Sequence, residues 1–270
     1  MNIYYQWEPG AYSNLTSEKV KELLDKNIEK IEWKIDFLSV WEAIGNGNIW
    51  VLPVENGYAW SIHENLHYFL RYDYKIIGEY DLEVNHCLLS LENNISKVKE
   101  VYSHPQALSQ VHNFLKKNNI KAKKSSDTAA AARYLKENNL RWTWAIASNL
   151  AWEIYGLNIL KKNIQDQEGN TTKFFVITKQ KEKINFSQKS NKVSLIFEAK
   201  NIPASLYKCL WAFATNNVNL TKIESIPNLK NPFSSLFFIS FEWKISNENV
   251  KKTLDELEFF TTQIKILWEY

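Results

Sequence analysis

A hydroxyl group and an ammonium group stand side by side near the middle of the chain, at Thr172 and Lys173. They precede Phe174–Ile177, four apolar residues rich in strand-forming types, which predict a buried strand. A hydroxyl beside a cation could take part in acid–base chemistry. The same pattern also has a purely structural interpretation, because threonine favours strands and a lysine at a strand end is usually solvated. The pair alone therefore does not establish a site.

Two further stretches place polar groups at the ends of predicted strands. Asn56 follows a strand predicted over Ile49–Pro53, and its amide can both donate and accept, which suits binding of a hydroxyl or a carboxylate. The turn Trp7–Ser13 separates a strand predicted over Asn2–Gln6 from a helix predicted over Ser17–Lys26. Because unpaired backbone N–H groups point outward at a helix start, this turn is a natural anion site.

Strands and helices also alternate over the rest of the first 180 residues. A helix is predicted over Ser61–Arg71 and a strand over Tyr80–Leu91, which contains His86. We interpret His86 as structural, because isolated histidines on strands usually have satisfied hydrogen bonds. Ser103 precedes a further predicted helix, and an alanine run after Thr128 begins another.

The C-terminal third predicts a separate domain. Residues 181–191 are polar and lysine-rich and predict a linker between domains at 1–180 and 192–270. The order strand, helix, strand, strand, helix, strand predicts a ferredoxin-like sandwich with helices on one face of an antiparallel sheet. The elements are expected at Val193–Glu198, Ser205–Asn216, Leu220–Ile226, Leu236–Glu242, Asn247–Phe259 and Gln263–Leu267.

The composition, with 45% hydrophobic and 23% charged residues, is that of a soluble globular protein. The net charge of +3 is small and the lysines are scattered, so nothing indicates nucleic-acid binding. Cys87 and Cys209 lie far apart without metal-ligand spacing, which favours free thiols in a reducing compartment. Since neither a signal peptide nor a membrane-spanning run is found, we expect a cytoplasmic protein that binds no membrane and no metal.

Six stretches occur in the order found in the prephenate dehydratase family, which the chain resembles from about Asn2 to Leu267. The stretches are Trp7–Ser13, Pro53–Asn56, Ser103–Gln110, Asp127–Ala132, Ala145–Leu157 and Thr172–Phe174. Two later stretches, Ile202–Lys208 and Asn219–Pro227, resemble the ACT regulatory domain of the same enzymes. The resemblance implies a catalytic domain of two α/β lobes, like a periplasmic binding protein, with the site in the cleft between them.

The resemblance also implies a reaction. The family enzymes convert prephenate to phenylpyruvate in phenylalanine biosynthesis, with loss of CO₂ and water, and use no metal or organic cofactor. Phenylalanine is their feedback effector, and we expect a homodimer or homotetramer. Two alternatives remain open, namely the same fold acting on arogenate and a catalytically inactive amino-acid sensor.

Single residues receive roles from the same resemblance. Thr172 is implied as the principal catalytic residue, which donates a proton to the departing hydroxyl, and Lys173 as its catalytic neighbour. Substrate binding is implied for Ser13, Glu55, Asn56, Ser103, Gln110, Thr128 and Phe174. Binding of L-phenylalanine, at a subunit interface, is implied for Ala204, Leu206, Asn216, Asn219, Leu220, Glu224 and Ser225.

Two departures from the family pattern bear on function. Lys173 stands where the family has arginine. Arginine offers a carboxylate two parallel hydrogen bonds whereas lysine is a mobile point charge, so we expect retained charge and looser substrate orientation. Ile226 replaces an arginine of the ACT motif, which leaves the strength of feedback inhibition open.

Tryptophan stands at several positions where the family has glycine or another small residue. The chain has 7 glycines and 11 tryptophans, whereas average usage predicts roughly 19 glycines at this length. UGA encodes tryptophan in one variant genetic code and glycine in another, so we hypothesise that many of these residues are glycine in the cell. We then expect several rings to be exposed, or beside the cleft with strained backbones. The glycine positions are Trp7, Trp50, Trp60, Trp211, Trp243 and Trp268, and the small-residue positions are Trp142, Trp144 and Trp152.

Overall fold

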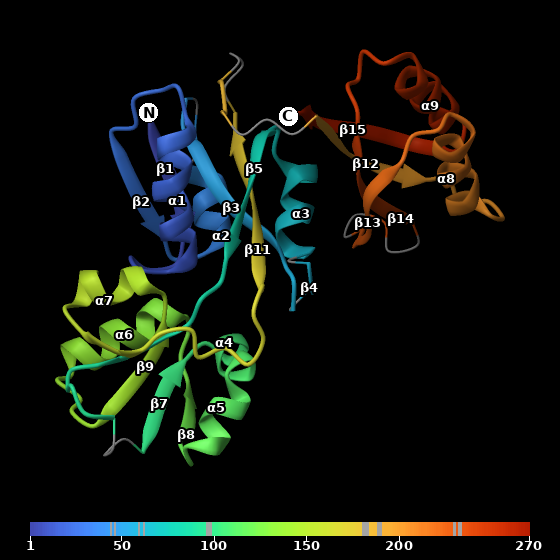
Figure 1. The fold of residues 1–270 in the computed structure, drawn as a ribbon. Helices are drawn as coiled ribbons and strands as arrows, with labels where there is room; N and C mark the ends of the chain where they lie inside the picture. The colour runs from blue at the N-terminus through green and yellow to red at the C-terminus, as the bar shows by residue number, and fades with distance from the viewer. Residues whose placement is uncertain are drawn as a thin grey trace.

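The computed structural model describes residues 1–43, 45, 47–58, 60–61, 63–95, 99–179, 184–187, 191–228, 231 and 234–270, without the side chains of residues 60, 61, 63, 64 and 268. In this part of the chain, two α/β lobes are followed by a C-terminal domain (Figure 1). The C-terminal domain lies beside the first lobe, and the second lobe lies at the far end of the first. The predicted fold class is confirmed.

The first lobe is a mixed sheet in the order β2-β1-β3-β11-β5, with β4 (Trp60–Ser61) paired to β3. β1 pairs in parallel with β2 and β3, whereas β11 runs antiparallel to both β3 and β5. Helix α1 packs on one face of the sheet, and α2 and α3 pack on the other. The bounds are β1 Asn2–Gln6, α1 Tyr12–Leu23, β2 Lys30–Lys34, α2 Phe37–Ala43, β3 Ile49–Asn56, α3 His63–Arg71, β5 Lys75–Glu83 and β11 Thr171–Thr178.

The second lobe is a sheet in the order β10-β6-β9-β7-β8. The chain enters it after β5 and returns to the first lobe through β11, so two strands of one sheet lead to the lobe boundary. The bounds are β6 Cys87–Ser90, β7 Glu100–Ser103, α4 Pro105–Gln110, α5 His112–Lys117, β8 Lys121–Lys124, α6 Thr128–Glu137, β9 Thr143–Ala147, α7 Asn149–Tyr155 and β10 Asn158–Lys161.

The two lobes touch at the turn after β1. Gly10 has a φ of 90°, and a Cβ on it would lie 2.9 Å from Cα of Ala151 in α7, so glycine is required here. Its carbonyl accepts a hydrogen bond from Ser148 Oγ at 2.6 Å. Arg133 of α6 forms a two-pronged ion pair with Glu8, at 2.6 and 2.9 Å. The turn therefore fixes the second lobe against the first.

The C-terminal domain has the predicted element order and a sheet in the order β13-β14-β12-β15. Helices α8 and α9 cover one face of this sheet. Residues Leu236–Phe241 of β14 are buried without alternation, which means that the other face is covered as well. The bounds are β12 Lys192–Ala199, α8 Ser205–Thr215, β13 Leu220–Pro227, β14 Ser235–Glu242, α9 Glu248–Glu258 and β15 Thr261–Glu269.

The second face of that sheet packs on the first lobe. One buried cluster contains Ile196 and Phe238 of the C-terminal domain together with Trp41 and Phe175 of the first lobe. The rings of Phe175 and Phe238 lie 6.1 Å apart. The two domains thus share one hydrophobic core, which couples their stabilities.

Two predicted element boundaries are wrong. Helix α1 begins at Tyr12 rather than Ser17, because the chain turns into the helix directly after Gly10. The single strand predicted over Tyr80–Leu91 is two strands, β5 and β6. Their apolar patterns run on in sequence, although the chain passes from one lobe to the other between them.

The predicted linker is partly buried. Ile184 and Phe186 are 4% and 3% exposed and pack with Val20 of α1, and the backbone N–H of Ser187 donates to the carbonyl of Leu23. This stretch is tied to the first lobe rather than solvated, because its two apolar side chains find a groove there. Residues 181–183 and 188–190 of the predicted linker lie outside the described residues.

The described residues contain no helix long and apolar enough to cross a membrane. They also contain no group of three or more His, Cys, Asp or Glu side chains that could hold a metal ion. Cys87 and Cys209 are both buried and not in disulfides.

The tryptophans meet the expectation in part. Trp7, Trp142 and Trp243 have φ values of 78°, 64° and 145°, and Trp152 and Trp211 are exposed, as expected for residues at small-residue positions. Trp50 and Trp144 are instead buried, so these two are not among the exposed or strained rings. The side chains of residues 60 and 268 lie outside the described part.

Candidate active site

A pocket with about 630 Å³ of empty space, its open mouth included, lies where the two lobes meet. The first lobe contributes β3 and β11, and the second contributes the starts of α4 and α6. Lining residues are Trp7, Tyr12, Pro53, Asn56, Val84, His86, His104, Gln106, Ala107, Gln110, Asp127, Thr128, Thr172 and Phe174.

Asn56 and Thr172 form the polar centre of the pocket. They are direct partners in the β3–β11 ladder, and Asn56 Nδ2 donates to Thr172 Oγ1 at 2.8 Å. Asn56 Oδ1 accepts from Gln106 Nε2 at 3.2 Å, which reaches across from the second lobe. Because the threonine oxygen already accepts this hydrogen bond, its own O–H proton remains available to an oxygen bound in the pocket.

A β-bulge shapes this wall. Lys173 pairs with Glu55, but the next residue, Phe174, pairs with Pro53, so Val54 is the extra residue. Strand alternation puts Phe174 on the same side as Thr172, and the bulge brings Pro53 to that side as well. The pocket therefore has a polar centre flanked by apolar side chains.

A buried histidine forms the opposite side of the pocket. His86 Nε2 lies 2.8 Å from Gln110 Oε1, and His86 Nδ1 lies 2.8 Å from the Tyr12 hydroxyl. Gln110 Oε1 also accepts from Asn170 Nδ2, so the Nε2–H of His86 donates to it, while the Tyr12 hydroxyl also donates to the Asn85 carbonyl at 2.9 Å. Burial lowers the pKa of His86, against a smaller opposing effect of the hydrogen bond to Gln110. The imidazole is therefore neutral near pH 7.

This histidine predicts how stability depends on pH. The unfolded state takes up a proton near the ordinary pKa of 6.5 whereas folded His86 does not, so acid favours the unfolded state and stability falls as the pH drops below 6.5. Urea unfolding at pH values on either side of 6.5 measures the loss. His86→Gln keeps a hydrogen-bonding side chain and is expected to reduce the slope; an unchanged slope in this variant would contradict the assignment.

Two more titratable groups face the pocket. Asp127 caps α6 by accepting from the backbone N–H groups of Ala129 and Ala130, at 2.7 and 2.9 Å, although burial raises the pKa of its carboxyl. His104 Nδ1 accepts from the backbone N–H of Gln106, and burial lowers its pKa, so its Nε2–H is a donor. The lining residues just named include no lysine and no arginine.

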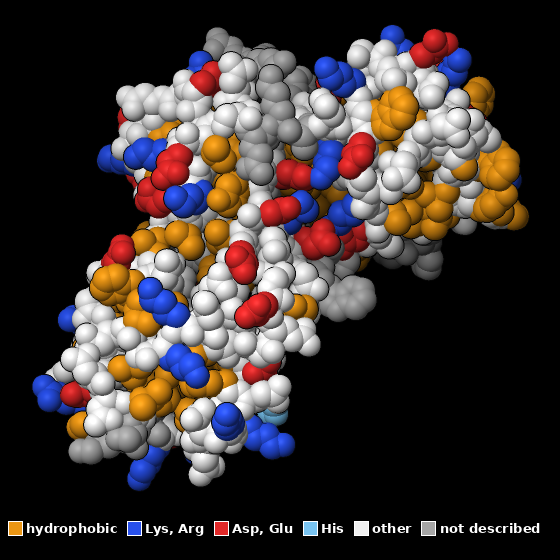
Figure 2. Space-filling model, in the orientation of Figure 1, with side chains coloured by type: hydrophobic (Ala, Val, Ile, Leu, Met, Phe, Trp, Pro, Cys, Tyr) orange, Lys and Arg blue, Asp and Glu red, His pale blue; other side chains and the backbone are white. Residues whose placement is uncertain are grey.

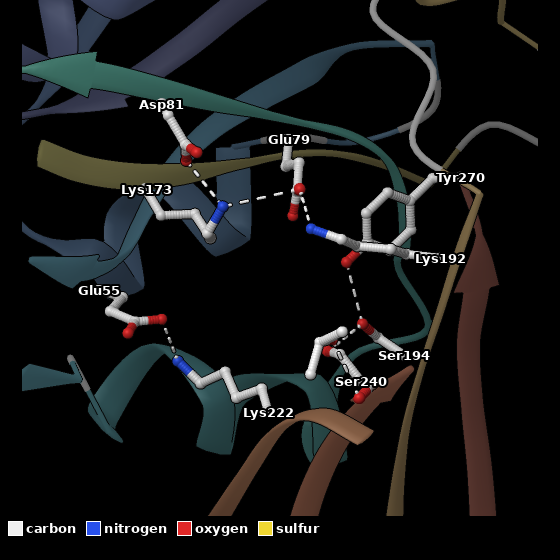
Figure 3. Close-up of polar contacts among 10 residues, drawn as sticks. Glu55, Glu79, Asp81, Lys173, Lys192, Ser194, Lys222, Ser240 and Tyr270 are labelled. Carbon is white, nitrogen blue, oxygen red and sulfur yellow. Dashed lines mark hydrogen bonds and ion pairs between the residues drawn. The ribbon is translucent and has the colours of Figure 1, made fainter. Parts of the chain in front are cut away.

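Lys173 lies outside the pocket. Adjacent residues of a strand point to opposite faces, and the Lys173 ammonium is 2.7 Å from Asp81 and 3.6 Å from Glu79, both on β5 (Figure 3). Burial opposes the charged form of Lys173, but the hydrogen bond to Asp81 and the charge of Glu79 outweigh it and raise its pKa. Lys173 is therefore paired with two carboxylates of its own lobe, whereas a substrate-binding lysine was expected to face the pocket.

The other predicted site residues divide into two groups. Asn56, Gln110, Thr128, Thr172 and Phe174 are brought together around the pocket. Outside its walls, Ser103 Oγ donates to the Ile146 carbonyl at 2.6 Å, Glu55 pairs with Lys222, and Ser13 is buried near the start of α1.

Sequence reasoning missed several lining residues. His104 and Gln106 lie inside the matched stretch Ser103–Gln110, so that stretch held the signal, but only Ser103 and Gln110 were selected from it. Asp127 begins the matched stretch Asp127–Ala132, but only Thr128 was selected from that stretch. His86 was interpreted as structural, and no local pattern could reveal that it faces α4 and Tyr12.

The predicted effector residues lie at both ends of α8 and along β13. Ala204, with a φ of 58°, caps the start of α8, and Asn216 caps its end. The helix has 11 residues and is therefore about 16 Å long, too long for both ends to contact one amino acid. Within one chain these residues do not form a single pocket.

Comparisons with known proteins agree with this architecture. The sequence model of the prephenate dehydratase family, described as "Prephenate dehydratase", matches residues 3–182. A prephenate dehydratase of Methanocaldococcus jannaschii is 36% identical over 99% of this chain and 97% of its own length. An arogenate dehydratase/prephenate dehydratase of Arabidopsis thaliana is 36% identical over all of this chain and 72% of its own length. The crystal structure of an Arthrobacter aurescens prephenate dehydratase in complex with L-Phe superposes with a TM-score of 0.86 at 20% identity, over all of this chain and 90% of that one.

Two lobes around a pocket with a hydroxyl–amide centre, joined to a ferredoxin-like domain, define a two-domain α/β enzyme of the binding-protein-like class with an ACT-type C-terminal domain. The chain belongs to the prephenate dehydratase family.

Proposed function

We propose that this protein is a prephenate dehydratase with Thr172 as the proton donor. The observation that carries the proposal is the Asn56–Thr172 hydrogen bond inside the pocket. In the reaction the ring carboxylate leaves as CO₂, its bonding electrons make the ring aromatic, and the ring hydroxyl departs. Hydroxide is a poor leaving group, so the hydroxyl must gain a proton to leave as water, and a positioned donor typically contributes about 10²–10⁴-fold.

The charge of the pocket supports this assignment. Prephenate carries two carboxylates, but the described lining supplies neutral donors such as the Thr172 hydroxyl and the Nε2–H of His104. An anion in a weakly polar site without a cationic partner is poorly stabilised. Loss of CO₂ passes the charge of the ring carboxylate through the ring to the departing hydroxyl, which takes the Thr172 proton and leaves as water. The charge then rests on Thr172 Oγ1, to which Asn56 Nδ2 donates, until a proton from solvent restores the hydroxyl.

The experiment is an assay of the purified chain with prephenate, followed by the alkaline absorbance of phenylpyruvate. Turnover supports the proposal. Absence of turnover with both prephenate and arogenate would overturn it and favour the inactive sensor.

Arogenate is the second candidate substrate. It carries an ammonium group in place of the keto group of prephenate, and the Asp127 carboxylate at the pocket wall is a group that could pair with it. The name of the Arabidopsis relative includes both activities. Incubation with arogenate and detection of phenylalanine distinguishes the two substrates.

We propose L-phenylalanine as the effector, bound between C-terminal domains of two chains. Because opposite ends of α8 carry the predicted effector residues, a site made from both ends needs a second copy. Hydrophobic side chains also gather on the C-terminal domain in Figure 2. Tyr207 and Trp211 of α8 are both exposed, as expected of a dimer surface. Calorimetry with millimolar phenylalanine tests binding, and sedimentation velocity distinguishes a monomer from a dimer or tetramer; no heat and a monomer would reject both proposals.

A further inference from the structure

Three tryptophans have a backbone conformation that glycine adopts. Among the described residues, eight residues other than glycine have a positive φ. Asparagine tolerates this conformation through local hydrogen bonds, and alanine has only a Cβ to place. For a bulky side chain it is a genuine outlier. The eight are Asn119, Asn139, Asn163, Asn217, Ala204, Trp7, Trp142 and Trp243.

Main-chain hydrogen bonds hold two of these backbones in place. The N–H of Trp7 donates to the carbonyl of Lys34 at 3.0 Å, and the N–H of Trp243 donates to the carbonyl of Asn191 at 2.7 Å. Each bond connects a turn to a neighbouring element, so main-chain contacts rather than the side chain determine the positive φ angle. Glycine adopts this conformation without strain, so it is the residue that suits positions 7 and 243.

Other tryptophans show what a well-placed ring looks like here. Trp41 is fully buried and stacks on Tyr72 and Tyr74, with interplanar angles of 17° and 8°. It has no positive φ. The strain is thus confined to particular positions rather than shared by every tryptophan in the described part of the chain.

We infer that residues 7, 142 and 243 are glycine positions and that the protein made in its own cells carries glycine there. The chain has only 7 glycines but 11 tryptophans. If UGA codons that the cell reads as glycine are translated as tryptophan, the glycine count falls and the tryptophan count rises by the same number. At residue 7 this has a consequence for the site. The Trp7 ring forms part of the pocket wall, 6.3 Å from the ring of His104, and glycine would remove it and enlarge the pocket.

Peptide mass spectrometry of the protein purified from its own cells reads residues 7, 142 and 243 directly. Glycine masses, with UGA codons in the gene, are the expected result. Tryptophan masses, or UGG codons, would overturn the inference.

Variants of the tryptophan-bearing chain give an independent measurement. Trp142→Gly and Trp243→Gly are each expected to raise Tm by about 2–4 °C, the shift that relief of modest strain produces in a chain of this size. Trp33→Gly is the matched control, because Trp33 is exposed on β2 without a positive φ, and it should lower Tm since glycine weakens a strand. No rise in either variant would contradict the strain argument.

The pocket offers a third readout, which rests on the proposed function. Trp7→Gly is expected to raise kcat/KM for prephenate about tenfold or more, as removal of a steric block from a pocket does. An unchanged or lower value would show that the ring at position 7 does not obstruct the substrate. The Tm and mass measurements stay decisive for the glycine positions even if prephenate is not the substrate.

A second inference comes from the charged groups between the domains. Glu55 and Lys173 are partners in the β3–β11 ladder, in the row next to Asn56 and Thr172 but on the opposite face. Charged side chains of both signs gather at this junction (Figure 2). The face of β3 and β11 opposite to the pocket is therefore charged at Glu55 and Lys173, and this face is turned towards the C-terminal domain.

Ion pairs connect this surface to two strands of the C-terminal domain (Figure 3). Lys222 of β13 lies 2.8 Å from Glu55. On the other side, Lys173 shares Glu79 with Lys192 of β12. Lys222 also lies 3.3 Å from Glu224 of its own strand. The side chains of Lys222 and Glu79 are only 16% and 13% exposed, so reversing a charge in this group places like charges together where water screens them poorly.

We propose that Glu55 and Lys173 are positioning residues, which hold Asn56 and Thr172 in register according to the position of the C-terminal domain. This inference rests on the proposed function and adds a physical route by which an effector in the C-terminal domain alters the reaction. Through the ion pairs, a shift of β12 or β13 would displace the ends of β3 and β11, which carry Asn56 and Thr172. Effector binding in the C-terminal domain and substrate binding in the pocket are then coupled by one free energy.

Charge reversal tests the route. Lys222→Glu and Glu55→Lys are each expected to lower kcat about fivefold or more, with KM changed less than about twofold, and the double variant is expected to recover to within about threefold. Lys252→Glu is the matched control, because Lys252 forms an exposed pair with Glu248 on α9. Single variants with unchanged kcat, or a double variant no better than the singles, would overturn the proposal.

Amide hydrogen exchange separates this result from a failure of the proposed function. Exchange at Asn56 and Thr172 needs no substrate, and it should be faster in Lys222→Glu and restored in the double variant. If the unmodified chain is inactive on prephenate but exchange follows this pattern, the proposed function fails and the positioning role stands. Unaltered exchange in all variants would reject the positioning role.

Discussion

Replacing Thr172 by alanine is expected to lower kcat for prephenate by about 10²–10⁴-fold, with KM changed less than about threefold. The hydroxyl acts on an oxygen that becomes a leaving group only in the transition state, so its loss affects the rate more than binding. Asn56 Nδ2, now paired to Thr172 Oγ1 at 2.8 Å, would lose its acceptor in a buried position, which costs about 1–3 kcal/mol of stability. Steady-state kinetics and urea unfolding of the variant measure the two effects separately.

Two neighbouring substitutions isolate the hydroxyl. Thr172→Ser keeps the oxygen and should retain most of the rate. Thr171→Ala removes a hydroxyl one residue earlier on β11, where alternation turns the side chain away from the Thr172 face, and should leave the kinetics unchanged. A loss smaller than tenfold in Thr172→Ala, or an equal loss in Thr171→Ala, would remove Thr172 from the role of proton donor.

Strand periodicity explains both a success and an error of the sequence analysis. The apolar run Phe174–Ile177 correctly predicts a buried strand, and a period of two puts Thr172 and Phe174 on one face. The same period puts Lys173 on the other face, with Asp81 and Glu79. The sequence analysis assigned both Thr172 and Lys173 to the site, although strand alternation alone predicts that Lys173 points away from the pocket.

The second wall of the pocket could not be predicted in the same way. His86, Tyr12 and Gln110 form a connected group, although they come from the lobe connection, α1 and α4. Gln110 was predicted from the family resemblance, but nothing in the local patterns of His86 and Tyr12 differs from that of structural residues, since only the closure of one lobe on the other brings them together. The bulge at Val54 is equally invisible, because it depends on the register between β3 and β11.

The sequence could predict part of the domain interface. An uninterrupted apolar run such as Leu236–Phe238 is typical of a strand covered on both faces, whereas the prediction covered the sheet with helices on one face only. The run therefore signals a partner for the second face. It does not identify that partner, which the structure shows to be the first lobe.

Replacing Phe238 by alanine is expected to lower the free energy of unfolding by about 3–5 kcal/mol, the largest effect on stability among the predictions made for this chain. Phe238 is fully buried, lies in the same buried cluster as Ile196 and Trp41, and contacts Phe175 of β11. A cavity there has walls from both domains, so neither domain can close it alone. Urea unfolding followed by circular dichroism measures the loss.

The shape of the transition matters as much as its midpoint. If the two domains unfold as one unit, as their common core requires, Phe238→Ala shifts a single transition to lower urea. Phe259→Ala is the matched control, because Phe259 is 72% exposed beyond α9, and it should change the free energy of unfolding by less than about 0.5 kcal/mol. Two separate transitions, with only the one belonging to the C-terminal domain shifted, would show that Phe238 stabilises its own domain alone. In that case β11, which carries Thr172 on one face and Phe175 on the other, would not depend on the C-terminal domain for its stability.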